Sequence, residues 1–106
     1  MDNDIESFFE ASELLKTIAH PVRLCIIAGL LEKGCCNVTT MHSCLEIPQP
    51  TVSRHLQKLK SLGIIDGERS GLEIHYKVID TRVIDIINLL VKWYLKLILK
   101  NLNFKI

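Results

Sequence analysis

Glycine and proline are scarce in this sequence: its 106 residues include five glycines and three prolines. This scarcity excludes fibrous and linker-like chains, and the 48% share of hydrophobic residues excludes a largely disordered one. A long apolar run is also lacking, because polar residues from Asp85 onwards interrupt residues 83–99 along one helical stripe. The first residues are acidic and lack the basic and apolar regions of a secretory signal. We therefore expect one cytoplasmic domain with no membrane span.

The net charge of +1 conceals an uneven distribution of charge. Residues 1–13 contain five acids and no base, whereas residues 14–106 contain thirteen bases and seven acids. A basic body therefore follows an acidic leader, and the near-neutral total does not argue against a polyanionic partner.

Apolar residues recur at helical spacing through the first third of the chain. The spacing predicts one helix over residues 5–18 and a second, central helix from Pro21 to about Gly34. Proline suits the first position of a helix, and glycine suits the position after its end. We expect His20 to cap or pack against this second helix, and Cys25 to be a small core residue within it.

A pair of short helices follows a brief extended segment at residues 35–38, which has the character of a connector or an edge strand. The first is predicted over residues 38–45, and the second runs from the turn at Ile47–Pro50 to about residue 62, with Gly63 as its cap. Four apolar residues at steps of four, three and three define the expected buried face of the second: Val52, Leu56, Leu59 and Leu62.

The period then changes from helical to alternating. Leu72, Ile74, Tyr76 and Val78 alternate with polar residues, which is typical of a half-buried strand. Ser70 and Gly71 are placed to form a hairpin turn after a first strand, and Asp80 precedes a long helix to about residue 100.

This order predicts a mainly α fold with a small β-hairpin: a winged helix-turn-helix with the order α-α-(β)-α-α-β-β-α. The whole chain, residues 1–106, forms one domain, with the helix-turn-helix at residues 38–62 and the wing at residues 64–79. A polar helix after a tight turn is how such folds enter the major groove of DNA.

Polar side chains on the second short helix supply the chemistry for DNA binding. Four of them can form hydrogen bonds with base edges: Gln49, Thr51, Ser53 and His55. Arg54, Lys58 and Lys60 can neutralise phosphates, and Arg69, His75 and Lys77 of the hairpin can contact the backbone or a minor groove. The alternative is an ordinary solvated helix face, which the combination with a tight turn and a basic hairpin disfavours.

Four stretches together resemble the ArsR/SmtB family of bacterial winged-helix repressors, over about residues 12–91: Ala19–Leu24, Pro48–Leu59, Leu62–Ile65 and Gly71–Tyr76. The runs Asn37–Thr39 and Gly71–Ile74 are most similar to its PagR-type members. The resemblance implies a homodimer, joined through the helices at residues 1–18 and 80–100, that represses transcription from a palindromic operator in double-stranded DNA. It places recognition-helix contacts at Gln49, Thr51, Ser53, Arg54 and His55, and wing contacts at Arg69, Ser70 and His75.

The last helix gives independent support for a dimer, because its apolar stripe is longer than one small core can cover. The stripe consists of Val83, Ile86, Ile87, Leu90, Trp93, Tyr94, Leu97 and Ile98. The alternative is that the stripe packs only on its own domain.

The usual metal-binding positions of the family hold other residues here, so no cofactor is expected. The resemblance places one site's cysteines at Asn37 and Thr39, and the other site's ligands at Arg82, Trp93 and Lys96. Reduced thiols remain as sensor candidates: Cys35, Cys36 and Cys44, with His42 nearby, offer either a soft-metal site or a redox switch. The inducer is unknown.

Two other classes of function compete with DNA binding. A winged fold that has lost DNA reading would serve as a protein-interaction module through its acidic leader and apolar last helix, but the basic recognition helix disfavours that function. An enzyme is not expected, because the sequence shows no phosphate-cradling glycine loop, no paired carboxylates and no nucleophile–base pair.

Overall fold

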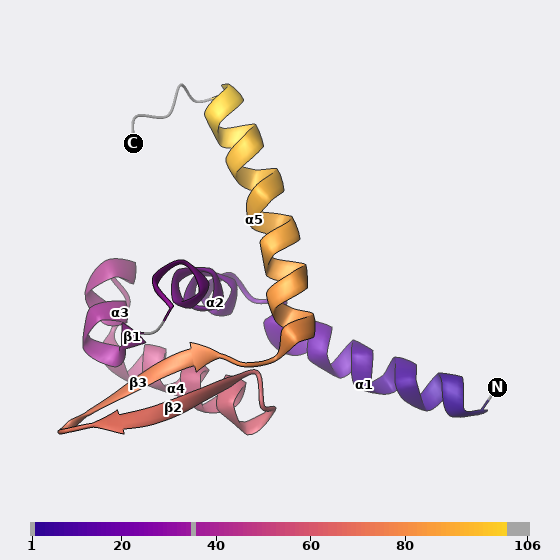
Figure 1. The fold of residues 1–106 in the computed structure, drawn as a ribbon, viewed down its shortest axis with the longest axis horizontal. Helices are drawn as coiled ribbons and strands as arrows, with labels where there is room; N and C mark the ends of the chain where they lie inside the picture. Colours follow the sequence, from indigo (N-terminus) through magenta and orange to yellow (C-terminus); the bar gives the residue numbers. More distant parts are fainter. Residues whose placement is uncertain (1, 35, 102–106) are drawn as a thin grey trace.

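The computed structural model describes residues 2–34 and 36–101, with side chains for residues 4–34, 37–42 and 45–93. The described elements are α1 (Asp2–Ile18), α2 (Pro21–Lys33), β1 (Cys36–Asn37), α3 (Val38–Leu45), α4 (Gln49–Ser61), β2 (Ile65–Ser70), β3 (Glu73–Val78) and α5 (Thr81–Asn101). This order confirms the predicted winged helix-turn-helix (Figure 1).

Helix α2 begins and ends as its sequence predicts. The Nδ1 atom of His20 accepts a hydrogen bond from the N–H of Val22 (3.1 Å), and Gly34 ends the helix with a φ of 86°. The buried face of α2 consists of Ile26, Ile27 and Leu30. The prediction of a buried Cys25 is wrong, since Cys25 is exposed. Successive helical residues are turned by about 100°, which places Cys25 on the side opposite this buried face.

Strands β2 and β3 pair antiparallel, with Ile65 opposite Val78 at one end and Ser70 opposite Glu73 at the other. Strand β1 pairs with the other edge of β3. Within the segment predicted as connector or edge strand, Cys36–Asn37 is therefore an edge strand. The predicted Ser70–Gly71 turn is wrong by one residue, because Ser70 still pairs with Glu73 and the turn is Gly71–Leu72. A φ of 66° at Gly71 allows this tight turn. Leu72 lies at the tip and is 99% exposed, not half-buried as its alternation predicts.

The core lies between α2, α4, the base of the hairpin and the start of α5. Its largest fully buried residues are Ile26, Ile27, Leu30, Val52, Leu56, Leu59, Ile64, Ile65, Val83 and Ile87. The prediction that Leu62 belongs to it is wrong, since Leu62 is 43% exposed. Helix α4 ends at Ser61, and the N–H groups of Gly63 and Ile64 bond back to the carbonyls of Lys60 and Leu59 in a Schellman cap. That cap turns the chain before Leu62 can join the buried stripe.

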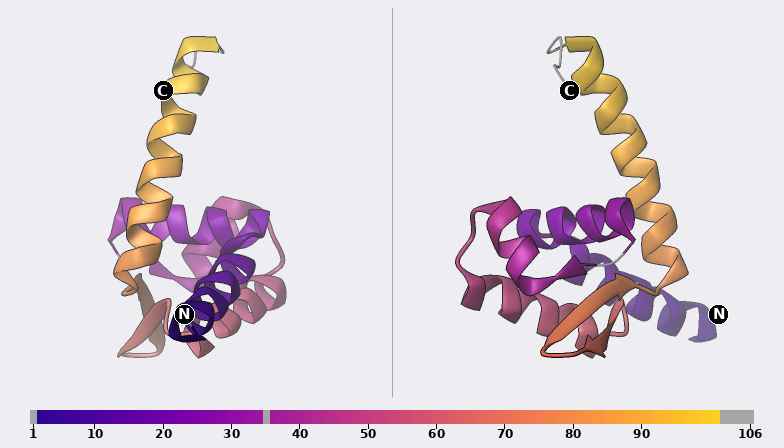
Figure 2. Two further views of the ribbon diagram at one scale, coloured as in Figure 1. Left: turned by 90° about the vertical axis from the view of Figure 1, so that its right-hand side faces the viewer. Right: turned by 60° about the vertical axis from the view of Figure 1, so that its left-hand side comes forward.

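The outer parts of α1 and α5 project away from the body (Figures 1 and 2). The radius of gyration is 15.3 Å, whereas a compact domain of this length has about 13 Å. Both projecting helices expose large apolar residues: Ile5, Phe8, Phe9 and Leu15 on α1, and Leu89, Leu90 and Trp93 on α5. Among the described residues no single helix is long and apolar enough to cross a membrane; α1 and α2 satisfy length and composition only as a pair bent by 90°.

Asp80 caps α5 and connects the hairpin to it. Its Oδ1 accepts hydrogen bonds from the N–H groups of Arg82 (2.9 Å) and Val83 (3.3 Å), and its Oδ2 lies 2.7 Å from Nη2 of Arg82. The hydrogen bonds from the Arg82 side chain are the main cause that lowers the pKa of Asp80 below its usual 3.8, with the two backbone N–H groups adding to the effect.

We expect Asp80→Ala to lower the free energy of unfolding by about 0.5–2 kcal/mol at neutral pH, because it removes this cap. The folded state binds the Asp80 proton more weakly than the unfolded state, so the charge-dependent part of this stability is present above pH 3.8 and is lost as pH falls through the folded pKa. Urea denaturation at pH 7 and pH 3 measures the difference. Asp80→Asn is the control, since it retains the cap acceptor without the charge.

Candidate nucleic-acid interface

The helix-turn-helix owes its shape to caps at both of its junctions. The Asn37 side chain caps α3 by accepting a hydrogen bond from the N–H of Thr40 (2.8 Å). Glu46 ends α3 in the left-handed region (φ 56°), and the Nδ1 atom of His42 bonds with the carbonyl of Ile47 within the turn. Pro48 and Pro50 then set the first turn of α4. These contacts fix the direction in which α4 leaves α3.

One face of α4 is buried and the opposite face is polar. Val52, Leu56 and Leu59 are no more than 1% exposed, which confirms three of the four residues predicted for the buried face. Of the predicted DNA contacts, Gln49, Arg54 and Lys58 are exposed, whereas Thr51, Ser53 and His55 are half-buried. The helix contains no acidic residue, and Lys58 and Lys60 lie in its last turn. Its polar face can therefore approach a polyanion without a repulsive carboxylate of its own.

Among the predicted DNA contacts on α4, His55 has a side-chain hydrogen bond to the body of the domain. Its Nδ1 atom accepts a hydrogen bond from Nε of Arg23 (3.1 Å), and its ring centroid lies 4.6 Å from that of His20. Burial lowers the pKa of His55 below 6.5, and electrostatic interactions with His20, Arg23 and Arg54 lower it further. At neutral pH His55 is therefore uncharged and acts only as a hydrogen-bonding group.

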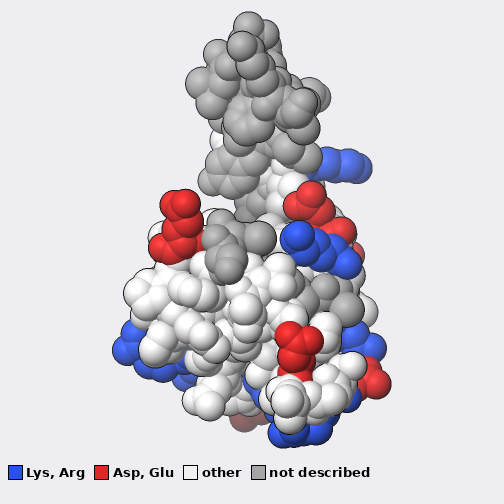
Figure 3. Space-filling model, turned by 90° about the vertical axis from the view of Figure 1, so that its left-hand side faces the viewer, with Lys and Arg blue, Asp and Glu red and all other residues white. Residues whose placement is uncertain are grey.

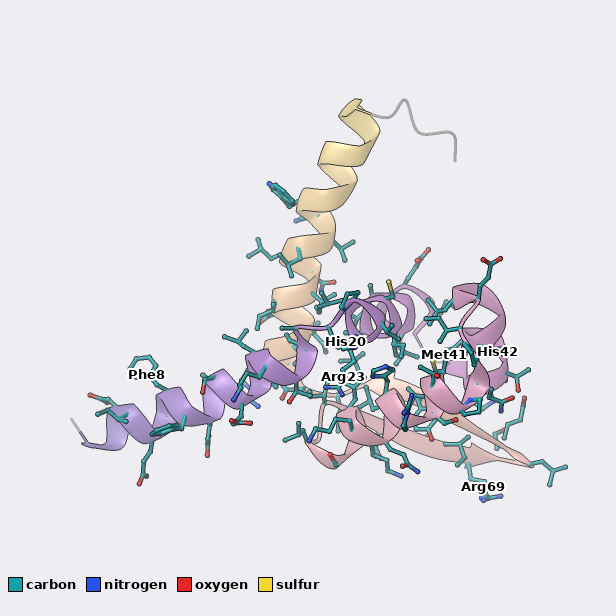
Figure 4. The ribbon with its side chains drawn as sticks, turned by 180° about the vertical axis from the view of Figure 1, so that it is seen from behind. Phe8, His20, Arg23, Met41, His42 and Arg69 are labelled. Atoms are coloured by element: carbon teal, nitrogen blue, oxygen red, sulfur yellow. The ribbon has the colours of Figure 1, made fainter. Side chains whose placement is uncertain are left out.

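The two faces of the hairpin separate the predicted wing residues. The register places Arg69 opposite Ile74, on the face that carries Tyr76 and Val78. Figure 4 shows the Arg69 side chain near the hairpin tip, extending away from the ribbon. Gly67 makes room on this face, since a Cβ there would lie 2.7 Å from the Cγ2 atom of Ile74.

The other face of the hairpin holds Ser70, His75 and Lys77. Acidic residues stand opposite or beside each of them: Lys77 pairs with Asp66, His75 with Glu68, and Ser70 with Glu73. The Nε2 atom of His75 also lies 3.6 Å from Oε1 of Glu73. This face is therefore a mixed surface of both charges, while Arg69 stands apart from it.

A shallow hollow joins the helix-turn-helix to the wing. Its volume is about 230 Å³. Its lining residues come from the starts of α3 and α4 and from the outer hairpin: Asn37, Val38, Thr39, Gln49, Leu72, Glu73, Ile74 and Tyr76. Asn37 bridges the two parts, because its Nδ2 donates to Oε2 of Glu73 (2.8 Å) while its Oδ1 caps α3. Figure 3 shows Lys and Arg side chains along the lower edge of the molecule, at the height of α4 and the hairpin, with acidic side chains among them. The hollow thus places Gln49, the first residue of α4, beside the outer hairpin.

Sequence reasoning missed three residues that organise this surface: Arg23, Asn37 and Glu73. Arg23 and His55 are 32 positions apart in the sequence, and Asn37 and Glu73 are 36 positions apart. No local spacing of residues predicts contacts over such separations. The available signal was the position of all three within the stretches that carry the family resemblance.

The thiol sensor predicted at Cys35, Cys36 and Cys44 lies outside the described side chains. Within the described residues no group of three or more His, Cys, Asp or Glu is placed to hold a metal ion. Positions 37 and 82, where the resemblance places metal ligands, carry other contacts here: Asn37 caps α3, and Arg82 pairs with Asp80.

Comparisons with known proteins agree with this geometry. A family model described as a helix-turn-helix domain matches residues 18–68. The transcriptional repressor PagR of Bacillus anthracis is 42% identical over 85% of this chain and 92% of its own length. The HTH-type transcriptional repressor SmtB of Mycobacterium tuberculosis (strain ATCC 25618 / H37Rv) is 43% identical over 73% of this chain and 56% of its own length.

Solved structures show the same relationship. The crystal structure of PagR superposes with a TM-score of 0.74, covering 81% of this chain and 98% of PagR. Reduced HlyU from Vibrio cholerae N16961, at 29% identity, gives a TM-score of 0.83 and covers 89% of this chain and 98% of HlyU. The chain therefore belongs to the ArsR/SmtB family of DNA-binding helix-turn-helix transcriptional repressors and not to an enzyme family.

Proposed function

We propose that this protein acts in the cytoplasm as a homodimeric repressor that binds a palindromic operator with two copies of α4. The observation that carries this proposal is the polar face of α4, which contains no acidic residue and whose first residue, Gln49, borders the hollow next to the wing. In a two-fold dimer, two such helices would enter successive major grooves about 34 Å apart.

The contacts divide by chemistry. Gln49, Thr51, Ser53 and His55 form hydrogen bonds with base edges, and Gln49 can bond to adenine in a bidentate manner. Arg54 and Lys58 neutralise phosphates. Of the wing residues, Arg69 reaches a minor groove or its phosphates, while Ser70, His75 and Lys77 contact the backbone. The exposure of Gln49, Arg54, Lys58, Arg69, Ser70 and Lys77 supports these roles.

The dimer interface is formed by α1 and α5. Two grooves border these helices. One, of about 390 Å³, is lined by apolar Phe9, Leu14 and Leu62 and by charged Glu10, Glu13 and Arg82, and the other, of about 200 Å³, lies between α2 and α5. Among the described side chains, apolar residues and Cys25 line the second groove. Large apolar surfaces on two projecting helices favour burial against a second copy of the chain.

The functional test compares one base-reading residue with one phosphate-binding residue. The wild type is first used to enrich its preferred duplex from a random-sequence library. Gln49→Ala should then weaken binding to that duplex by about 1–3 kcal/mol and relax its sequence preference. Lys58→Ala should weaken binding to all duplexes alike and reduce the slope of log affinity against log salt by about one.

Fluorescence anisotropy at several salt concentrations measures both effects, and Lys33→Ala, which removes a charge at the far end of α2, is the control. Failure of the wild type to enrich any duplex would contradict the proposal and would favour a protein-interaction module.

Release of the operator by a thiol-directed signal is part of the proposal. Titration of the complex with soft metals, peroxide and polysulfide, using the wild type and a variant without Cys35, Cys36 and Cys44, tests it. If both proteins release the operator equally, these three thiols are not the sensor. If neither protein releases it, the operator is regulated by something other than these thiols.

A further inference from the structure

Arg23 connects three helices beneath the DNA-binding surface. It lies near the start of α2, and its Nη1 atom donates to the carbonyl of Thr17 at the end of α1 (2.9 Å). Its Nε atom donates to Nδ1 of His55 on α4 (3.1 Å). Thr17 is itself buried, and its Oγ1 donates to the carbonyl of Glu13 (2.9 Å). Figure 4 shows Arg23 and His20 where the end of α1 approaches α2 and α4.

The direction of the Arg23–His55 hydrogen bond fixes the chemistry of the ring. A guanidinium has only donors and stays protonated, so Nδ1 of His55 must carry a lone pair. The proton of the neutral ring is then on Nε2, and any further hydrogen bond through Nε2 must be donated by His55. The groups that face the ring from other elements are His20 and Arg23, with Arg54 on α4 itself.

His20 adds to this constraint. Its own Nδ1 accepts from the N–H of Val22, so the ring that lies against His55 is held by the start of α2. Protonation of His55 would put a third positive charge beside Arg23 and Arg54 and would break the bond to Arg23. Both effects favour the neutral ring.

We propose that Arg23 is a positioning residue of the DNA interface: it holds His55 as a neutral donor through Nε2 and ties the recognition helix to the end of α1. This inference rests on the proposed function. It assigns His55 to an acceptor on DNA, such as guanine O6 or N7, adenine N7, thymine O4 or a phosphate oxygen. Because α1 belongs to the proposed dimer interface, Arg23 also sets the position of α4 relative to the partner copy.

Nitrogen-15 NMR of the histidine rings in the free protein tests the first part. In the wild type, His55 should show the Nε2–H tautomer and titrate below pH 6.5. In Arg23→Ala the titration midpoint should rise, because a donor to the neutral ring and a neighbouring positive charge are both removed, and the two tautomers should mix. A wild-type His55 protonated on Nδ1 would overturn the inference, whatever the protein binds.

A double-mutant cycle on the enriched duplex tests the second part. Arg23→Ala and His55→Ala should each weaken binding by roughly 5- to 50-fold, as expected for coupled residues in contact. Combined, they should weaken it no more than one of them alone. His55→Gln should retain most of the affinity, since its side-chain oxygen can accept from Arg23. Additive losses would show that Arg23 does not act through His55.

Two further variants separate positioning from folding and charge. Arg23→Lys preserves the charge, but a single ammonium does not reproduce the fork that spans a carbonyl and a ring. Arg23→Lys should lower the affinity for the enriched duplex as Arg23→Ala does. Wild-type affinity of this variant would contradict the inference. Lys33→Ala removes the same charge from the same helix and should leave the His55 spectrum unchanged.

Discussion

Replacing Phe8 and Phe9 together by serine is expected to separate the proposed dimer and to lower operator affinity by about 100-fold or more. Both side chains are exposed on α1, at 72% and 66%, so the fold of one copy does not depend on them. Two linked recognition helices bind with an effective concentration that a single helix lacks, and this advantage is typically about 10²–10⁴. Analytical ultracentrifugation measures the mass, and anisotropy with the enriched duplex measures the affinity.

The control for this prediction retains the apolar character of α1. Phe8→Leu combined with Phe9→Leu should remain dimeric and should keep most of the affinity, because most of the buried apolar area is preserved. A serine variant that stays dimeric would move the interface away from α1. A serine variant that becomes monomeric but binds as tightly as the wild type would show that one recognition helix suffices.

Leu56→Ala is expected to cost about 2–5 kcal/mol of unfolding free energy, because it leaves a cavity under the recognition helix. Leu56 is 1% exposed and lies between Val52 and Leu59 on the buried face of α4. A domain of this size is stable by about 5–15 kcal/mol in total, so the variant should lose a substantial part of that stability. Urea denaturation followed by circular dichroism measures the shift in midpoint.

The same substitution at the wing tip provides the control. Leu72 is 99% exposed, and Leu72→Ala should change the free energy of unfolding by no more than about 0.5 kcal/mol. Equal losses at the two positions would show that the buried stripe of α4 does not anchor the helix.

Local chemistry explains why so much of the fold was predictable. Helix α3 has the predicted bounds, and α2 begins at Pro21 and ends before Gly34, because proline, glycine and capping residues act within a few positions of the helix ends. The alternation of Ile74, Tyr76 and Val78 likewise identified a half-buried strand. The described part of the stripe on α5 contains buried Val83 and Ile87, so its first turns pack on their own domain.

Two of the errors, at Leu62 and Leu72, share one physical origin: the spacing of apolar residues does not show where a helix or strand ends. Leu62 continues the apolar spacing of α4, but the Schellman cap removes it from the buried face. Leu72 continues the alternation of β3, but the chain is already in the turn. The contacts of Arg23 with His55 and of Asn37 with Glu73 depend on tertiary packing, so the geometry of the candidate site required the structure.

Two hydrogen bonds of the Asn37 side chain limit which residues can replace it. One side chain both starts α3 and anchors the hairpin through Glu73, and a thiol at this position could do neither as well. Position 37 is also where the family resemblance places the first cysteine of a metal site. A descendant that acquired metal sensing there would lose part of the bracing of its wing, and would need a second substitution to restore it.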